Sequence, residues 1–536
     1  MQVSWAAKSV FAALILSGLS GAPAQAQTGT FAQQGGANAP NPASNMFLLT
    51  DGTIMVQIGR TANWQRLCPN NAGSYRNGSW SGSNGCPAIA SIPASFNYAP
   101  FFYASTVLPD GRVILMGAEF NGSSGLANQG AIYNPKTDVW LPVRPPAGWT
   151  GIGDAQSVVL PSGQYMIANC CRDGGRKQAL FNPNNLTWTP TGANSQSGND
   201  EAGWTLLPDG SVLTIDINSG AVNGNANSTA ERWVNGTWYS AGQTQELSDC
   251  TYEVVASTRP YIACTAGINQ NNEMGPQVLL PTSPPTVLAV GANGAASIYT
   301  PPPAGTTQTG TWTNTASFPS TCGTAGTGQC MMADGPASLL PSGNVLVFAG
   351  PLYDNQGCHF FEFTGAGWSQ VATDPPNAAS DRSWNGHTLL LPDGTVMFTD
   401  ESSDVEIYTP NGTPVAPNPA WQPTITSFPN AITRGVTYLI YGKLFNGMSQ
   451  ANAYGDENQT PTNYPVLRII NQASGHVFYG RTHDHSAMGV AMTTTPVSTK
   501  FEIPATAGGL AVETGPAWLE VVANGIPSPR VSVVIN

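Results

Sequence analysis

The chain has 536 residues, of which only 9% are Asp, Glu, Lys or Arg, while glycine (59) and proline (44) are abundant. This length allows two or more domains, and the many turn-forming residues, without long helical periodicity, favour an all-β protein. The formal net charge of -12 argues against nucleic-acid binding, which requires a basic face.

The N-terminal segment has the pattern of a secretory signal. Lys8 precedes an apolar stretch at 10–16, and the small residues AQA at 24–26 suit a cleavage position. The stretch is too short to span a membrane, and no later segment offers an uncharged apolar run of membrane length. We therefore expect residues 1–26 to be a signal peptide and the mature protein to be secreted, either extracellular or periplasmic, without a membrane span.

The nine cysteines fit an oxidising compartment. Three pairs each bracket a short polar loop, which predicts local disulfides. These pairs are Cys68 with Cys86, Cys250 with Cys264, and Cys322 with Cys330. Cys170, Cys171 and Cys358 cannot all pair within the chain, so at least one is free or pairs between chains. A bridge between the adjacent Cys170 and Cys171 is one alternative.

A strand–turn–strand unit repeats along the chain, as in FYASTVLPDGRVILMG and HTLLLPDGTVMF. Its turn glycines are Gly52, Gly111, Gly163, Gly210, Gly343 and Gly394. The long interval after Gly210 contains a degenerate unit, GPQVLLPTSPPTVLAVG, whose turn lacks the glycine. Seven units of roughly 45 to 65 residues match the period of a four-stranded propeller blade. The sequence therefore predicts a seven-bladed β-propeller over residues 27–418.

A tryptophan marks the outer strand of six units, where an aromatic ring would fill the gap between neighbouring blades. These residues are Trp80, Trp140, Trp188, Trp238, Trp312 and Trp368. The seventh unit ends at 408–410 without such a strand, while the mature N-terminus offers TGTFAQQ with Phe31 at the tryptophan phase. Because an open blade leaves an unpaired edge, we predict that residues 28–34 supply the outer strand of the seventh blade.

The pattern changes at about residue 419. Short segments such as TYLIYGKLF and AWLEVVANG alternate apolar and polar residues up to residue 536. This predicts a C-terminal β-sandwich of immunoglobulin-like type. The segment carries three of the five histidines, His476, His483 and His485.

A seven-bladed kelch-type propeller followed by a C-terminal immunoglobulin-like (early-set) domain resembles the galactose oxidase and glyoxal oxidase family over nearly the whole mature chain. The most specific pieces are HTLLLPDGTVMF in the last unit and HDHSAMG in the C-terminal domain. The resemblance implies a site at the propeller mouth. Family members that are oxidases hold copper there through two tyrosines, one propeller histidine and one C-terminal histidine, and one tyrosine is cross-linked to a cysteine.

This chain departs from that pattern. Counted back from the turn proline of each unit, Phe102 stands where the family has cysteine, Asp154 and Trp384 where it has tyrosine, and Asn385 where it has histidine. Without these ligands a copper radical site loses most of its inner coordination. We therefore expect a copper-free protein.

The alternative is a divergent copper oxidase of alcohols or aldehydes. It would use the C-terminal histidine, His485 or His483, together with His387 and Tyr103. A third class is a non-enzymatic scaffold that binds proteins through the propeller faces.

Carboxylates recur at one position of the repeat. Asp154, Glu201 and Asp334 each stand seven residues before their turn proline. This position faces the central mouth, where unpaired buried carboxylates are costly. Such a ring predicts either ligands for calcium or another divalent cation or a general acid and base acting on a polysaccharide. Solvated strand ends are the structural alternative.

The expected site adds aromatic and C-terminal residues to this ring. Phe102, Tyr103 and Trp384 would offer flat apolar surfaces to a sugar, beside Asn385. The resemblance implies that the loop GRTHDHSAMG brings His485 and Asp484 close to the acidic ring. The sequence thus predicts an exported propeller protein that binds or remodels glycans at its mouth.

Overall fold

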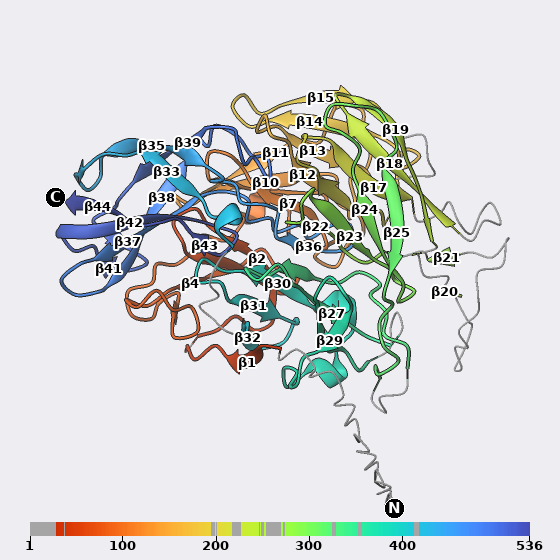
Figure 1. The fold of residues 1–536 in the computed structure, drawn as a ribbon, viewed down its shortest axis with the longest axis horizontal. Coiled ribbons are helices and arrows are strands. Elements are labelled where there is room, and N and C mark those ends of the chain that lie inside the picture. The colour runs from red at the N-terminus through yellow and green to blue at the C-terminus, as the bar shows by residue number, and fades with distance from the viewer. Residues whose placement is uncertain are drawn as a thin grey trace, which may run out of the picture.

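The computed structural model describes residues 28–36, 38–193, 199, 201–216, 227–245, 247, 251–252, 270–271, 274–323, 328–351, 356–411 and 418–536. Its strands form seven four-stranded blades of a β-propeller, with a C-terminal β-sheet domain packed at its side (Figure 1). The predicted fold class is confirmed. Among the described residues, the structure contains no helix of the length and apolar character needed to cross a membrane.

The first four blades take their strands in chain order. Blade 1 is β2 (Ala43–Leu48), β3 (Ile54–Ile58), β4 (Trp64–Cys68) and β5 (Ser79–Trp80); blade 2 is β7 (Ala104–Val107), β8 (Val113–Met116), β10 (Gly130–Asn134) and β11 (Val139–Val143); blade 3 is β12 (Ser157–Val159), β13 (Tyr165–Ala168), β14 (Gln178–Asn182) and β15 (Thr187–Thr191); blade 4 is β16 (Trp204–Leu206), β17 (Val212–Asp216), β18 (Asn227–Val234) and β19 (Thr237–Gln245).

The last three blades include the one that closes the ring. Blade 5 is β22 (Gln277–Leu280), β23 (Thr286–Val290), β24 (Ala296–Thr300) and β25 (Thr311–Thr315); blade 6 is β26 (Ala337–Leu339), β27 (Val345–Ala349), β28 (His359–Phe363) and β29 (Trp368–Gln370); blade 7 is β30 (His387–Leu390), β31 (Val396–Thr399), β32 (Val405–Thr409) and β1 (Thr30–Gln33). Short pairs β6 (Pro100–Phe101) with β9 (Phe120–Asn121) and β20 (Thr251–Tyr252) with β21 (Gln270–Asn271) lie outside the blades. The 3-10 turns are η1 (Ala94–Phe96), η2 (Ala378–Ser380), η3 (Ser383–Asn385) and η4 (Pro419–Trp421).

The N-terminal strand closes the propeller as predicted. β1 pairs antiparallel with β32, with Phe31 opposite Tyr408, and the two strands lie side by side (Figure 1). Phe31 occupies the place that tryptophan takes in other blades, for example Trp140 opposite Tyr133. The outer strand of blade 7 therefore comes from the other end of the propeller sequence.

The C-terminal strands form one curled nine-stranded sheet. Its members are β33 (Thr424–Ser427), β34 (Ala431–Ile432), β35 (Thr437–Lys443), β37 (Val466–Asn471), β38 (Val477–His483), β39 (Val497–Glu502), β42 (Gly515–Ala523), β43 (Ile526–Pro527) and β44 (Val531–Ile535). A separate small pair is β40 (Thr506–Ala507) with β41 (Leu510–Ala511). The first half of β38 pairs with β37 and its second half with β39. The expected sandwich therefore has layers that share β38, around a core that includes Leu467, Phe478 and Phe501.

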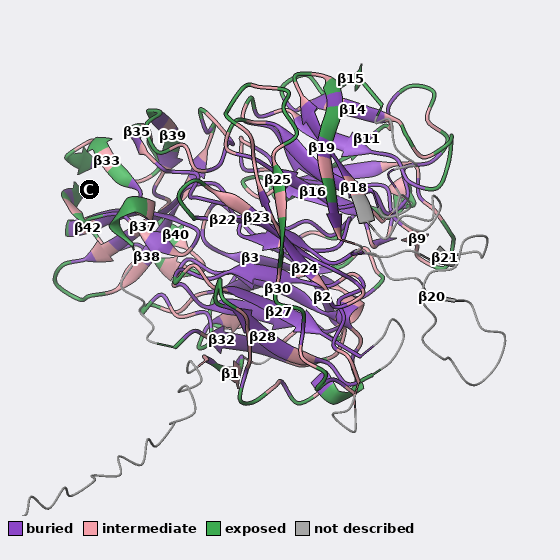
Figure 2. Cartoon of the chain, turned by 45° about the vertical axis from the view of Figure 1, so that its right-hand side comes forward, coloured by how far each residue is buried: buried purple, intermediate pink, exposed green. Residues whose placement is uncertain are grey.

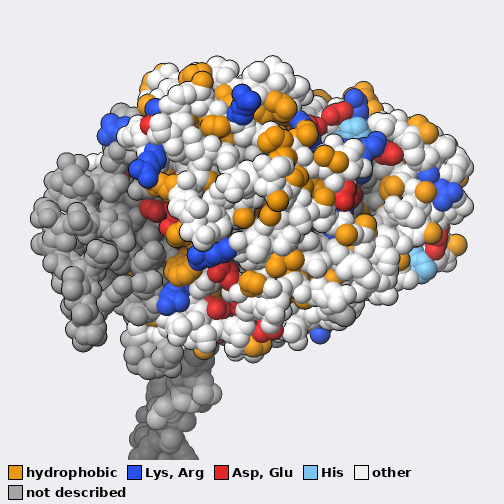
Figure 3. Space-filling view, turned by 180° about the vertical axis from the view of Figure 1, so that it is seen from behind, with side chains coloured by type: hydrophobic (Ala, Val, Ile, Leu, Met, Phe, Trp, Pro, Cys, Tyr) orange, Lys and Arg blue, Asp and Glu red, His pale blue; other side chains and the backbone are white. Residues whose placement is uncertain are grey.

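Burial follows the order of strands within each blade. Inner strands such as β7 and β30 are buried throughout, whereas outer strands such as β15 and β25 are largely exposed (Figure 2). Figure 3 shows one face of the molecule on which Lys and Arg side chains are scattered singly, so this face presents no continuous basic surface.

Candidate functional site

A segment of the C-terminal domain fills the central channel of the propeller. This channel segment, residues 444–465, connects β35 to β37, and all of its residues are buried except the half-buried Gln450 and Ala453. It contains the short strand β36 (Asn452–Ala453), which pairs with β26, the innermost strand of blade 6. The C-terminal domain therefore reaches the propeller axis, as expected, but by a different loop from the predicted one.

Hydrogen bonds hold the channel segment to several blades. The backbone N–H of Asn458 donates to the Tyr103 carbonyl in 3.0 Å, and the Leu206 N–H donates to Gln450 Oε1 in 2.9 Å. The side chain of Asn452 accepts from the Leu390 N–H in 2.9 Å. Because polar groups in a buried channel need partners, these bonds fix the position of the segment and of the residues at its tip.

The tip of the channel segment is Gly455-Asp456-Glu457. A Cβ on Gly455 would overlap Asp334 Oδ1 and lie 3.1 Å from the Asp334 Cα, while the Gly455 carbonyl abuts Gly203. The tip is therefore wedged between the inner edges of blades 6 and 4. Only glycine allows this approach, which brings Asp456 and Glu457 next to the carboxylates of the propeller.

We expect Gly455→Ala to displace this tip and to destabilise the protein by about 1–3 kcal/mol, the usual range for overpacking a tight buried site. Thermal unfolding measures the loss. Gly125→Ala is the matched control, because a Cβ there meets nothing within 4 Å. Equal melting temperatures for the two variants would contradict the wedged position of the tip.

Three carboxylates converge at this point. Ligand oxygens of Glu201, Asp334 and Asp456 all lie within 4.8 Å of one another. Asp456 is fully buried and receives a hydrogen bond from the Glu201 backbone, and its Oδ2 atom has no hydrogen-bond partner among the residues that the structure describes. Burial raises the pKa of Asp456. The three carboxyls therefore lie close together, with Asp456 buried and Glu201 and Asp334 half-buried.

Two of these residues have a strained backbone. Glu201 and Asp334 adopt the left-handed region, with φ of 56° and 44°, and Phe102 shares it with φ of 52°. These three residues occupy the same position of the repeat in blades 4, 6 and 2. Non-glycine residues adopt this conformation at a cost and often do so at functional sites. The left-handed backbone therefore gives these three side chains a direction different from the one that an extended strand would give them.

Glu201 and Asp334 border a cavity of about 220 Å³, here called the mouth cavity, and Asp456 lies buried behind them. Its lining residues are Arg60, Phe102, Glu119, Phe120, Asp154, Glu201, Asp334, Trp384 and Glu457. The Trp384 ring lies edge-on to Phe102 at 6.1 Å, and the Arg382 guanidinium lies 5.6 Å from the Trp384 ring. The cavity therefore combines an aromatic wall with an acidic floor.

Glu457 adds a buried carboxyl to the lining of the mouth cavity. Its pKa is raised well above the usual value by complete burial and by the nearby carboxyls of Asp456, Asp334 and Asp154. Burial and the neighbouring carboxyls both disfavour the ionised form of Glu457, whereas a bound cation would favour it.

Five sequence-predicted residues therefore meet at one cavity: Phe102, Asp154, Glu201, Asp334 and Trp384. Sequence reasoning missed Asp456, Glu457, Glu119 and Arg60. The signal that could have found the first two is the polar, repeat-free stretch NGMSQANAYGDENQTPTNYP between two strand patterns. A stretch of that kind rarely lacks a specific role inside a compact domain.

Two predicted ligand-binding residues point elsewhere. Tyr103 is buried, and its hydroxyl donates to Gln57 Oε1 in 2.7 Å. Asn385 ends η3, and its Nδ2 donates to Glu401 in 3.3 Å. Neither lines the mouth cavity.

The histidines of the C-terminal domain lie away from the acidic ring, which corrects the expected position of His485 and Asp484. The His485 backbone donates to the carbonyl of Pro109, its ring stacks on Tyr464, and its Nδ1 lies 2.8 Å from Thr499 Oγ1. Pro109 and Phe102 lie at opposite ends of the innermost strand of blade 2, a separation of roughly 20 Å for seven residues of extended chain.

His483 and Asp484 form a charged group near the same turn. His483 Nδ1 lies 3.2 Å from Asp484 Oδ2, which also pairs with Lys500 at 3.0 Å. Asp484 is exposed at 45% of its side chain, whereas His483 is exposed at 14% and its Nε2 has no hydrogen-bond partner among the described residues.

The residues present do not fit a copper radical site. His387 is buried and stacks on Tyr454 at 5.8 Å, and burial lowers its pKa to about 3. Within the described ranges, the groups with metal-ligand spacing are Glu201 with Asp334 and Asp456, and Asp154 with Cys170 and Cys171. Neither of these two groups includes a histidine. The oxygen ligands of the first group favour a hard cation over copper.

The disulfides agree with the sequence prediction where they are described. Cys68–Cys86 and Cys322–Cys330 are formed, and Cys358 is a buried free thiol. Cys250 and Cys264 lie outside the described residues. The vicinal Cys170–Cys171 bridge is also formed, and Cys171 Sγ lies 3.3 Å from Asp154 Oδ1 beside the mouth cavity.

No protein-family model matches the chain, and no curated protein matches it by sequence. Among solved structures, it is similar to a fungal alcohol oxidase of the AA5 family in complex with copper, at 15% identity over 95% of this chain and 99% of that chain, with a TM-score of 0.47. It is also similar to a streptogramin B lyase (11% identity, 72% and 98% coverage, TM-score 0.42) and to YjhT (12%, 62% and 98%, 0.37). At these identities the likeness concerns the fold alone.

Proposed function

We propose that this chain is an exported propeller protein that binds glycans at the mouth cavity through a divalent cation held by Glu201, Asp334 and Asp456. The observation that carries the proposal is the convergence of these three carboxylates within 4.8 Å beside an aromatic wall. The residues come from three distant parts of the chain, so the fold must bring them together at the cost of their mutual repulsion.

A bound cation removes that cost. Three carboxylates at this separation, one of them buried and two half-buried, repel one another. A hard cation such as Ca²⁺ accepts six to eight oxygen ligands. Asp456 supports this role because its buried Oδ2 has no hydrogen-bond partner. The remaining coordination positions would face the cavity, where sugar hydroxyls can occupy them.

The aromatic wall suits the apolar face of a sugar ring. Trp384 and Phe102 border the same cavity as the carboxylates, and Arg60 and Glu119 supply polar groups for hydroxyl recognition. Ligand sites commonly combine apolar walls with a few placed polar groups. The combination supports a carbohydrate ligand over a purely apolar one.

Export is supported by the signal-like N-terminus and by the disulfides Cys68–Cys86 and Cys322–Cys330, which persist in oxidising compartments. The mature protein would act outside the cell or in the periplasm.

One observation favours a second activity, glycan remodelling. Glu457 lines the cavity with a raised pKa, and Asp154 lies nearby. Two neighbouring carboxyls are the pair that glycoside hydrolysis uses as general acid and base. Release of reducing ends from bound glycans, lost in Glu457→Gln, would identify this activity.

The proposal predicts that a glycan array gives cation-dependent binding that chelation with EDTA abolishes. By calorimetry, Trp384→Ala should weaken the affinity for the best array hit about tenfold, which corresponds to about 1.4 kcal/mol. Tyr441→Ala is the matched control, because that aromatic side chain is 46% exposed on the C-terminal domain and outside the cavity. Absence of glycan binding, with partner proteins captured instead, would favour the scaffold alternative.

A further inference from the structure

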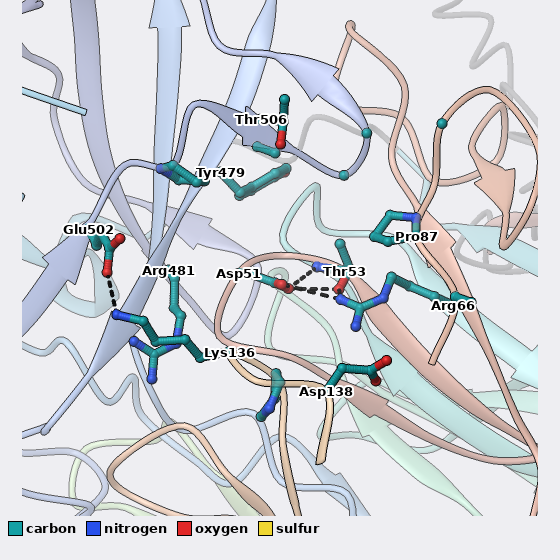
Figure 4. A pocket seen from close by; sticks show the side chains of 17 residues that line it. Asp51, Thr53, Arg66, Pro87, Lys136, Asp138, Tyr479, Arg481, Glu502 and Thr506 are labelled. Carbon is teal, nitrogen blue, oxygen red and sulfur yellow. Dashed lines mark hydrogen bonds and ion pairs between the residues drawn. The ribbon is translucent and has the colours of Figure 1, made fainter. Parts of the chain in front are cut away.

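A second cavity lies at the junction of the propeller and the C-terminal domain (Figure 4). Its volume is about 480 Å³. Blade 1 contributes Asp51, Thr53 and Arg66, the loop after β10 contributes Lys136, and β38 contributes Arg481. Asp51 lies in the turn after β2, so this junction cavity is at the opposite end of the inner strands from the mouth cavity.

Most charges that line the junction cavity are already neutralised. Arg66 pairs with Asp51 at 3.3 Å, and Lys136 pairs with Glu502 at 2.9 Å. Asp138 accepts hydrogen bonds from the Tyr133 hydroxyl and the Ala90 N–H. These groups give the cavity fixed donors and acceptors without a large net charge.

Arg481 is the exception among the three cations that line the cavity. Within the described part of the chain it forms no ion pair, its buried Nε has no hydrogen-bond partner, and its Nη2 makes only a long contact of 3.4 Å to the Asp110 carbonyl. Arg481 lies on the same side of the cavity as Lys136, across from Arg66 and Asp138 (Figure 4). A guanidinium that lines a cavity without an ion pair and with unsatisfied hydrogen-bond donors can bind an anion.

We propose that the junction cavity binds a small monoanionic carboxylate that carries hydroxyl groups, such as a hexuronic acid. The planar guanidinium of Arg481 matches a carboxylate in a two-bond fork. One unpaired cation beside the three acids Asp51, Asp138 and Glu502 suits one negative charge better than a dianionic phosphate. The hydroxyls of Thr53 and Thr506 can bond to the sugar hydroxyls, and Pro87, Pro504 and the Tyr479 ring supply apolar walls.

This site is independent of the mouth cavity. It shares no lining residue with that cavity and needs no cation. A chain with both sites would contact an acidic polysaccharide at two points or respond to a free sugar acid separately from its mouth ligand.

The test is calorimetric titration of the mature protein with glucuronate, with glucose and inorganic phosphate as comparison ligands. We expect saturable one-to-one binding of glucuronate alone, unchanged by EDTA and by Trp384→Ala. Arg481→Gln should weaken it at least tenfold, Arg481→Lys should retain part of it, and Arg76→Gln, at an exposed arginine outside the cavity, should leave it unchanged.

Several outcomes overturn the inference. They are no saturation at millimolar glucuronate, equal binding of phosphate or glucose, and full affinity in Arg481→Gln. Loss of binding in Trp384→Ala would place the ligand in the mouth cavity instead. If Arg481→Gln does not fold, Arg481→Lys decides, because a retained charge without the fork must weaken the affinity of a folded protein.

Discussion

Removal of residues 28–34 should lower the melting temperature of the mature protein by several degrees or more. This strap is the outer strand of blade 7, where β1 pairs with β32 along its full length. The Phe31 ring packs 4.5 Å from Phe360 and 4.8 Å from Tyr408. Without the strap, blade 7 keeps an unpaired edge and exposes these aromatic rings to water.

The strap also joins blade 7 to blade 1. The Gln34 N–H donates to the Val405 carbonyl in 2.8 Å, and Gln34 Oε1 accepts from Trp80 Nε1 in 2.6 Å. Loss of the strap therefore opens the ring at its seam as well as weakening one blade.

Point variants separate the packing of the strap from its mere presence. Phe31→Ala should destabilise the protein by about 2 kcal/mol, less than a fully buried phenylalanine because Phe31 is half-buried. Thr30→Ala is the matched control on the same strand, since Thr30 is exposed. A deletion variant that melts at the temperature of the full mature protein would disprove closure by the strap.

The stability of the protein should fall as the pH rises from about 5 to 9. A group of acids lies between blades 6 and 7, and burial together with the nearby Asp400 raises the pKa values of Asp381 and Glu406 to about 8. Burial also raises the pKa of Glu401 to about 7. Glu406 is 1% exposed, and within the described ranges neither of its carboxyl oxygens has a hydrogen-bond partner.

The direction follows from proton linkage. Ordinary carboxyls in the unfolded chain lose their protons near pH 4, whereas these groups keep theirs in the folded state up to pH 7 or 8. Between those values the folded state binds more protons, so each rise in pH lowers the free energy of unfolding. The stabilisation is complete below about pH 4 and is lost as pH passes the folded pKa values.

Glu406→Gln removes one of the carboxyl groups whose pKa is raised in the folded state, and so removes its contribution to the pH dependence. We expect this variant to be more stable than the parent at pH 9 by on the order of 1–3 kcal/mol, and to show a flatter decline with pH. Denaturant unfolding from pH 5 to 9 measures both. Glu513→Gln is the control, because its hydrogen bonds to Ser474 and His476 lower the pKa of Glu513. A parallel decline in all three proteins would contradict the linkage.

The propeller was predictable because residues close together in the sequence define each repeat. Six of the seven blades have a glycine in the turn, and six have a tryptophan at a fixed phase. Phe31 at that phase was enough to identify the strap. Counting back from the turn prolines also located Phe102, Glu201 and Asp334, which share one backbone conformation.

The same counting failed where local structure changes the direction of a side chain. Tyr103 follows Phe102, and neighbouring residues of an extended chain point to opposite faces, so it reaches Gln57 instead of the cavity. Asn385 belongs to the 3-10 turn η3, so the alternation of side chains expected for a strand does not apply at this position before blade 7.

The identity of the channel segment was not predictable from the residue pattern. The position of this segment is fixed by hydrogen bonds to residues far away in the sequence, such as Leu206 and Leu390. Its own residues show no repeating hydrophobic pattern. The histidine loop was favoured by resemblance, but its backbone is held at the turn of blade 2 by Pro109.

Calorimetric titration of the metal-free mature protein with calcium tests the central claim most directly. The account predicts one saturable site, weakened at least tenfold in Asp456→Asn, because that variant replaces a buried carboxylate whose Oδ2 lacks a hydrogen-bond partner. Asp393→Asn, at the turn of blade 7, should retain the affinity of the parent protein. Absence of calcium binding, or equal binding by the parent and Asp456→Asn, would contradict a cation at Glu201, Asp334 and Asp456.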